Sequence, residues 1–153
     1  MKKLTSRGFT LIELLVVIGI LAILLAITLI AINPARQFQQ SNDTKRSSDV
    51  NAILNAINQY MADNQGSLPT GITDTAQVIQ ATTFNDLCTA IVPLYIAALP
   101  VDPLTNNGTP VQTADCTGST WNTGYTVQQI SGSSRLTVAA PAAEIQPTIE
   151  VTR

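Results

Sequence analysis

One carboxylate, Glu13, stands at the start of a long apolar run, where an acid is costly. Residues 14–32 (LLVVIGILAILLAITLIAI) contain no charged side chain. An ionised carboxylate in hydrocarbon costs several kcal/mol unless it is paired, so an acid in such a segment indicates a functional site that needs a cation. The alternative is a residue at the level of the lipid headgroups, where a negative charge stabilises the start of a helix.

The second group with possible chemistry is the pair Cys88 and Cys116. In a small exported domain such a pair predicts a disulfide, worth about 2–4 kcal/mol because it constrains the unfolded chain. The alternative is two separate buried thiols. The sequence has no C-x-x-C motif and no third soft ligand beside them, which argues against a zinc or redox site.

The rest of the composition argues against catalysis and against nucleic-acid binding. The chain contains no histidine, which excludes histidine-based nucleophile systems and zinc sites with histidine ligands. Beyond residue 62, Arg135 and Arg153 are the only basic residues among a larger number of acidic ones, and the formal net charge is −2. Nucleic-acid binding needs clustered Lys and Arg. We therefore expect neither an enzyme nor direct nucleic-acid binding.

The apolar run predicts a helix that inserts into a membrane. Nineteen residues span about 28 Å as a helix, close to the ~30 Å hydrocarbon core of a bilayer. Lys2, Lys3 and Arg7 precede the run without an acidic neighbour, which predicts a cytoplasmic N-terminus and an exported C-terminal part. A cleaved secretory signal, whose apolar core is shorter, and a plain signal anchor are the alternatives. Neither explains Glu13.

The string from Arg7 to Glu13 (RGFTLIE), after a basic leader and before the apolar run, resembles the signal of type IV prepilins and pseudopilins. In that family a prepilin peptidase cuts after the glycine and methylates the new N-terminal phenylalanine. The resemblance thus implies cleavage between Gly8 and Phe9 and N-methylation of Phe9. A glycine suits a protease that needs an extended, unhindered backbone.

The resemblance also supplies a cation for Glu13. Cleavage creates an α-amino group on Phe9, and in the family this group is thought to meet the glutamate of a neighbouring subunit in the apolar core of a filament. Two charges in a medium of low dielectric constant are tolerable when they are paired, so the pair favours one axial register. The partners implied are other copies of the chain, the prepilin peptidase, an inner-membrane assembly platform and its ATPase.

A second helix is expected after the apolar run. Pro34 predicts a break or kink, because proline lacks a backbone donor and disfavours helix at the preceding residue. Within residues 33–61 a pattern of apolar residues at helical spacing predicts an amphipathic helix; its members are Val50, Ile53, Leu54, Ile57, Tyr60 and Met61. Asp43, Lys45, Arg46 and Asp49 form a mixed-charge collar that we interpret as a solvated or subunit-contacting surface.

The remaining residues, 62–153, predict a small exported head. Residues 73–83 are expected to form a short helix or turn, and alternating patterns predict strands at 124–130 and 135–139, with a possible third at 149–151. The predicted fold class is α+β and pilin-like: leader 1–8, membrane-inserting helix 9–32, amphipathic helix 33–61, and an antiparallel sheet packed on that helix. In the major pseudopilins a loop in this region binds calcium, so the resemblance makes Asp102 and Asp115 calcium candidates. Two acids on separate loops are a weak signal, however, and we interpret them as surface carboxylates and expect no metal site.

The function predicted is that of a structural subunit of a type IV pilus-like surface filament. It would start as a single-pass protein of the bacterial cytoplasmic membrane and end in an extracellular filament. One alternative is a pseudopilin of a type II secretion or DNA-uptake system. The alternative of another class is a membrane-anchored binding domain, which needs no cleavage at Phe9 and no role for Glu13.

Overall fold

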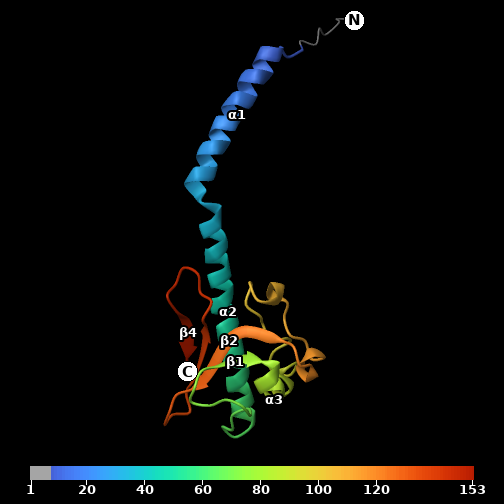
Figure 1. Cartoon of the computed structure of the whole chain (residues 1–153), viewed down its shortest axis with the longest axis vertical. Coiled ribbons are helices and arrows are strands. Elements are labelled where there is room, and N and C mark those ends of the chain that lie inside the picture. The colour runs from blue at the N-terminus through green and yellow to red at the C-terminus, as the bar shows by residue number, and fades with distance from the viewer. Residues whose placement is uncertain (1–7) are drawn as a thin grey trace, which may run out of the picture. The chain divides into compact units, whose positions relative to one another are not determined.

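The computed structural model describes residues 8–153, so Lys2, Lys3 and Arg7 of the leader lie outside the described part of the chain. The chain divides into two compact units, Met1–Phe38 and Gln39–Arg153. The first unit contains helix α1 (Leu11–Ile32) and the start of helix α2 (Pro34–Asp63). The second contains the rest of α2 and the whole head (Figure 1).

Helix α1 has 22 residues and no buried side chain. Its large apolar side chains, from Leu11 to Ile32, are each at least half exposed. Among residues 8–153 it is the one helix that is long and apolar enough to cross a membrane. At 1.5 Å per residue it is about 33 Å long, slightly more than a hydrocarbon core.

The two helices are separated at Asn33, as the sequence predicts. Asn33 has a left-handed backbone (φ 44°, ψ 77°) and caps the C-terminus of α1, and α2 begins at Pro34. Asparagine is one of the few non-glycine residues that tolerate this conformation. Proline both disfavours helix at the residue before it and fits the first position of a helix, where the missing N–H has no partner in any case.

The head contains a four-stranded antiparallel sheet in the order β1-β2-β3-β4. Its strands are β1 (Gln77–Gln80), β2 (Asn122–Gln129), β3 (Leu136–Ala140) and β4 (Ile149–Thr152), and helix α3 (Ala81–Ile91) follows β1 directly. The predicted α+β class and the three C-terminal strands are confirmed. The prediction of a helix or turn at 73–83 is wrong, because this segment contains β1, which pairs with β2.

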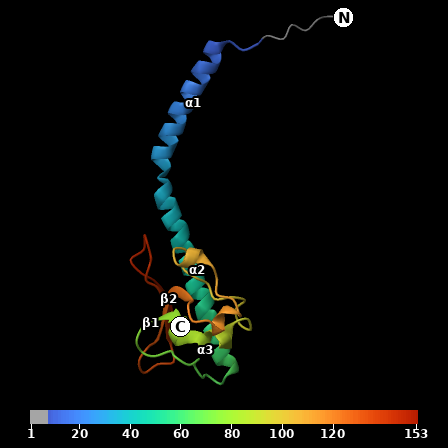
Figure 2. The ribbon, with the colours of Figure 1, turned by 45° about the vertical axis from the view of Figure 1, so that its right-hand side comes forward.

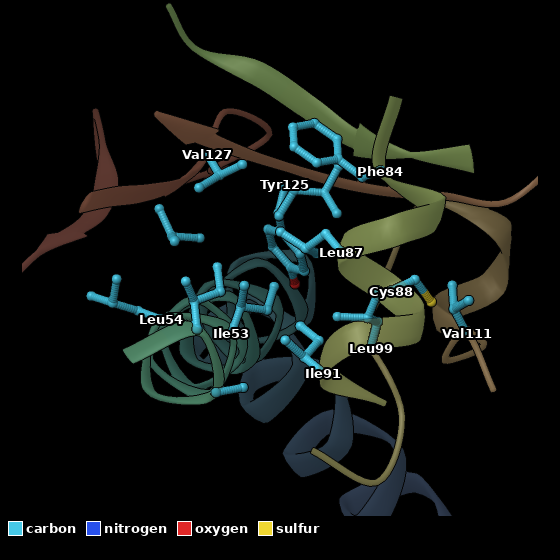
Figure 3. Close-up of a cluster of buried hydrophobic side chains, with 14 of the residues drawn as sticks. Ile53, Leu54, Phe84, Leu87, Cys88, Ile91, Leu99, Val111, Tyr125 and Val127 are labelled. Carbon is cyan, nitrogen blue, oxygen red and sulfur yellow. The ribbon is translucent and has the colours of Figure 1, made fainter. Parts of the chain in front are cut away.

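The core of the head lies between α2, α3 and the sheet (Figures 1 and 2). Figure 3 shows Ile53 and Leu54 of α2 facing Tyr125 and Val127 of β2, with Leu87 and Ile91 of α3 beside them. The predicted stripe of α2 is the helical face of this core, and Val50, Ile53, Leu54 and Ile57 are fully buried. Each such side chain contributes about 1.5–3 kcal/mol on burial.

Candidate functional site

The segment that carries the predicted cleavage site lies just before α1. Gly8 and Phe9 are exposed and outside any helix or strand. A Cβ added at Gly8 would meet no other atom within 4 Å. Gly8 and Phe9 are therefore accessible, as cleavage between them would require. Cleavage and methylation themselves stay predictions.

Glu13 takes part in a capping box at the start of α1. The backbone N–H and the hydroxyl of Thr10 donate to Oε2 of Glu13 at 2.8 and 2.7 Å, and the N–H of Glu13 donates to Oγ1 of Thr10 at 3.3 Å. Two backbone donors that a helix start leaves free are satisfied in this way. The helix-start role that the sequence offered as an alternative is thus present in the structure. The pairing of Glu13 with a neighbouring subunit stays a prediction.

Glu13 and Phe9 lie on one face of the chain. Together with Ile12, Val16 and Val17 they line a shallow hollow of about 350 Å³ on the surface of α1. Phe9 is 86% exposed. Apolar side chains therefore flank the Glu13 carboxylate, and no part of residues 8–153 covers them. A contact with another copy of the chain would need such an open apolar surface.

A second polar site lies in the head, where the Arg46 side chain is fully buried. Its Nε donates to Oδ2 of Asp102 at 2.6 Å, and its Nη2 to Oδ1 of the same residue at 3.2 Å. Its Nη1 contacts Oδ1 of Asp43 at 2.9 Å and Oε2 of Glu144 at 3.0 Å. The hydrogen bonds to Asp102 raise the pKa of Arg46 most, against the lowering by burial, and those to Asp43 and Glu144 add to the rise.

Asp43 connects the same network to a loop after β3. Its carboxylate accepts the backbone N–H groups of Glu144, Ile145 and Gln146 at 3.0, 2.8 and 3.2 Å. Burial raises the pKa of Asp43, but these N–H groups and Arg46 outweigh it, and the pKa falls from 3.8 to about 2. A carboxylate with three backbone donors and a guanidinium partner is stabilised in its charged form.

The interpretation of this collar as a solvated surface is therefore wrong for Asp43 and Arg46. Both are buried, while Lys45 is exposed. A signal was present in the helical spacing, because 43, 46, 50, 53, 54 and 57 fall on one face of α2. Asp43 and Arg46 thus extend the buried stripe by two turns. Apart from their contact with each other, their partners lie between 56 and 103 residues away in the sequence and could not be read from α2.

The calcium candidates do not fit calcium. Both carboxylate oxygens of Asp102 accept from Arg46, and Oδ1 also accepts the N–H of Leu104 at 2.9 Å. Asp115 caps its own turn by accepting the N–H of Gln112 at 2.9 Å. A divalent cation needs several free oxygen ligands, and a guanidinium on Asp102 repels it. The interpretation of Asp102 as a surface carboxylate is wrong, because its side chain is buried against Arg46. Among residues 8–153, no group of three His, Cys, Asp or Glu side chains is arranged so that it could hold a metal ion.

Cys88 and Cys116 are joined in a disulfide that ties α3 to the turn Asp115–Thr117. Both cysteines are fully buried. An open hollow of about 620 Å³ lies beside this turn and is lined by residues 105–106, 109–111, 114–115, 118 and 120–122. The structure thus contains the disulfide that the sequence predicted against the alternative of separate thiols.

Two comparisons with known proteins agree with this geometry. The profile of the family described as "Prokaryotic N-terminal methylation motif" matches residues 3–29. The chain is 33% identical over 103 residues to the type II secretion system core protein G of Escherichia coli (strain K12), an alignment that covers 67% of this chain and 69% of that protein. No solved structure matches the chain significantly. A leader motif of this kind, an exposed apolar α1 and an α+β head together place the chain in the type IV pilin and pseudopilin family.

Proposed function

We propose that this chain is the structural subunit of a type IV pilus-like surface filament, that a prepilin peptidase cuts it between Gly8 and Phe9, and that it assembles through α1. One observation carries the proposal: α1 has 22 residues, and none of them is buried by residues 8–153. Apolar side chains over this length do not remain in water. Their cover is a bilayer before assembly and the α1 helices of other copies afterwards.

The chemistry at the start of α1 supports assembly rather than catalysis. Cleavage places an α-amino group one residue before Thr10, next to the hollow that contains Glu13. The capping box engages Oε2, so the second carboxylate oxygen is left to meet the amino group of an adjacent copy. A charge pair in an apolar filament core is stable in one register only, because a shifted register leaves both charges unpaired. The chain would act without catalysing a reaction and without binding nucleic acid directly.

The proposed path begins in the cytoplasmic membrane. The basic leader keeps the N-terminus in the cytoplasm, and the head is exported. The disulfide of the head supports this orientation, since disulfides form and persist outside the reducing cytoplasm. After processing, an inner-membrane platform and its ATPase would move the subunit into the filament.

A second candidate is a pseudopilin of a type II secretion system. The observation that favours it is the similarity to a type II secretion system core protein. The two candidates share leader, helix and head, and they differ in whether a long filament leaves the cell surface. Electron microscopy of cells at native expression separates them. Long filaments that disappear with deletion of the gene support the pilus, whereas lost secretion without surface filaments supports the pseudopilin.

The decisive test is intact mass and N-terminal fragmentation of the protein from cells that contain a prepilin peptidase. We expect a chain that starts at Phe9 with one added methyl group. The control is Gly8→Val, whose side chain hinders the backbone at the scissile bond and should leave a chain that starts at Met1. A wild-type chain that starts at Met1, or that is cut beyond Ile32, would overturn the proposal in favour of an anchored or secreted binding domain.

A further inference from the structure

Arg46 joins three separate parts of the head through one side chain. Asp43 belongs to the same helix α2, Asp102 lies in the loop that the bridge between Leu99 and Val111 closes, and Glu144 lies in the loop between β3 and β4. The sequence separations between Arg46 and the last two are 56 and 98 residues. The guanidinium thus stands where these two loops approach α2.

The contacts of this cluster are complete. Each nitrogen of the guanidinium has a carboxylate partner, and no buried side-chain nitrogen or oxygen among the described residues lacks a hydrogen bond. The carboxylates in turn order the backbone. Asp102 accepts the N–H of Leu104, and Asp43 accepts those of residues 144–146. A buried charge without partners is costly, so this arrangement is stable only as a whole.

A divalent cation performs the same task in other loops: it gathers carboxylates from distant segments around one positive charge. A planar guanidinium with five donors also does this, and it is attached to the chain. We propose that Arg46 is the built-in cation of this head, and that the two loops are fixed on α2 without calcium. Both oxygens of Asp102 already accept hydrogen bonds from Arg46, so the place that a metal ion would take beside this carboxylate is filled by the guanidinium.

The inference does not depend on whether the filament is a pilus or a pseudopilus. It is tested on the full chain in detergent micelles by thermal unfolding, once with a chelator and once with millimolar CaCl2. A calcium site that exists only in the folded head raises Tm by several degrees when the calcium concentration is many times its Kd. We expect the same Tm within about 1 °C in both conditions, given the size of such linkage shifts. A rise of several degrees in calcium, or a fall of that size in chelator, would overturn the proposal.

Hydrogen exchange of backbone amides tests the role of Arg46 itself. We expect Arg46→Met, which keeps the length and loses the charge, to speed exchange at Leu104, Ile145 and Gln146 by about 10-fold or more, as local opening does. The amides of β2 should keep their protection. The control is Arg36→Met, which removes an exposed cation from the first turn of the same helix α2 and should change none of these amides. Unchanged exchange in Arg46→Met, or equal changes in both variants, would refute the role.

If Arg46→Met does not fold, Glu144→Gln replaces it. This change removes the charge from the most exposed of the three acids, whose side chain is 23% accessible. It weakens the contact of Oε2 with Arg46 at 3.0 Å, and Oε2 also accepts a hydrogen bond from Asn42 at 2.8 Å. We expect faster exchange confined to the backbone around Ile145, with Tm lowered by a few degrees at most. Exchange at wild-type rates there would contradict the proposal.

Discussion

The hydroxyl of Tyr125 on β2 donates a hydrogen bond of 2.8 Å to Oδ2 of Asp49 on α2. Tyr125 is fully buried and Asp49 is half-buried. Burial raises the pKa of Asp49, although the bond from Tyr125 works in the opposite direction. Burial also raises the pKa of Tyr125, and the contact with Asp49 raises it further. The pair therefore fixes the sheet on α2 in a place from which water is largely excluded.

Removal of this hydroxyl should be costly. We expect Tyr125→Phe to lower the free energy of unfolding by about 1–3 kcal/mol, because Asp49 then lacks its donor in a partly buried site. Urea unfolding of the full chain in detergent, followed by circular dichroism, measures the loss. The control is Tyr95→Phe, which removes a 3.0 Å bond to the exposed Asp63 and should cost much less. Equal effects of the two variants would contradict the importance of burial.

The lowered pKa of Asp43 should make the free energy of unfolding of the head depend on pH. Its pKa is about 2 in the folded chain against an ordinary 3.8, so the folded state binds fewer protons. Its contribution is present above about pH 4 and is lost as the pH falls toward 2. We expect Asp43→Asn to be less stable than wild type at pH 6 and the difference to shrink below pH 3. Urea midpoints over this range test it. A difference in stability between the variant and wild type that grows toward low pH would contradict a lowered pKa of Asp43.

The matched control for that pH series is Glu150→Gln. Glu150 is an exposed carboxylate on β4. Its replacement on the surface should change stability little.

The charge of Glu13 can be separated from its capping role. Glu13→Gln keeps an acceptor for Thr10 and removes the charge, whereas Thr10→Ala removes the cap and keeps the charge. We expect Glu13→Gln to insert and to be cleaved normally but to lose most of the filament yield, because the amino group of Phe9 lacks its partner. Thr10→Ala should weaken the helix start by about 0.5–2 kcal/mol and still assemble. The amount of sedimented filament measures assembly. Normal assembly of Glu13→Gln together with a loss in Thr10→Ala would show that Glu13 acts only as part of the helix cap.

The disulfide should stabilise the head in proportion to the loop that it closes. Cys88 and Cys116 are 28 residues apart. We expect the double change Cys88→Ala with Cys116→Ala to lower the free energy of unfolding by about 2–4 kcal/mol. Urea unfolding with and without a reductant measures it. The reductant should shift wild type toward the variant and leave the variant unchanged.

The break between α1 and α2 should depend on the proline. Pro34→Ala restores a backbone donor and removes the steric clash that keeps Asn33 out of the helical conformation. We expect continuous helical Cα chemical shifts across residues 30–36 in micelles. The control Asn33→Gly permits the left-handed backbone at no steric cost and should keep the break. A break that persists in Pro34→Ala would assign it to Asn33.

The sequence alone determined the features that depend on neighbouring residues. The apolar run required the exposed helix α1, Asn33-Pro34 required its end, and the spacing of Val50, Ile53 and Ile57 identified the buried face of α2. The family motif around Phe9 and Glu13 is likewise a linear signal. Helical periodicity, proline geometry and hydrophobic length act over a few residues, so a pattern suffices.

Which charged side chains are buried in the head, and with which partners, could be learned only from the tertiary structure. Arg46 and Asp43 look like surface charges in the sequence, and they are buried because Asp102 and residues 144–146 reach them from distant segments. Strand β1 was missed for the same reason, since four residues show no clear alternation and their pairing with β2 makes them a strand. A charge can be buried only where folding supplies its partners, and local patterns contain no information about partners that lie up to 103 residues away.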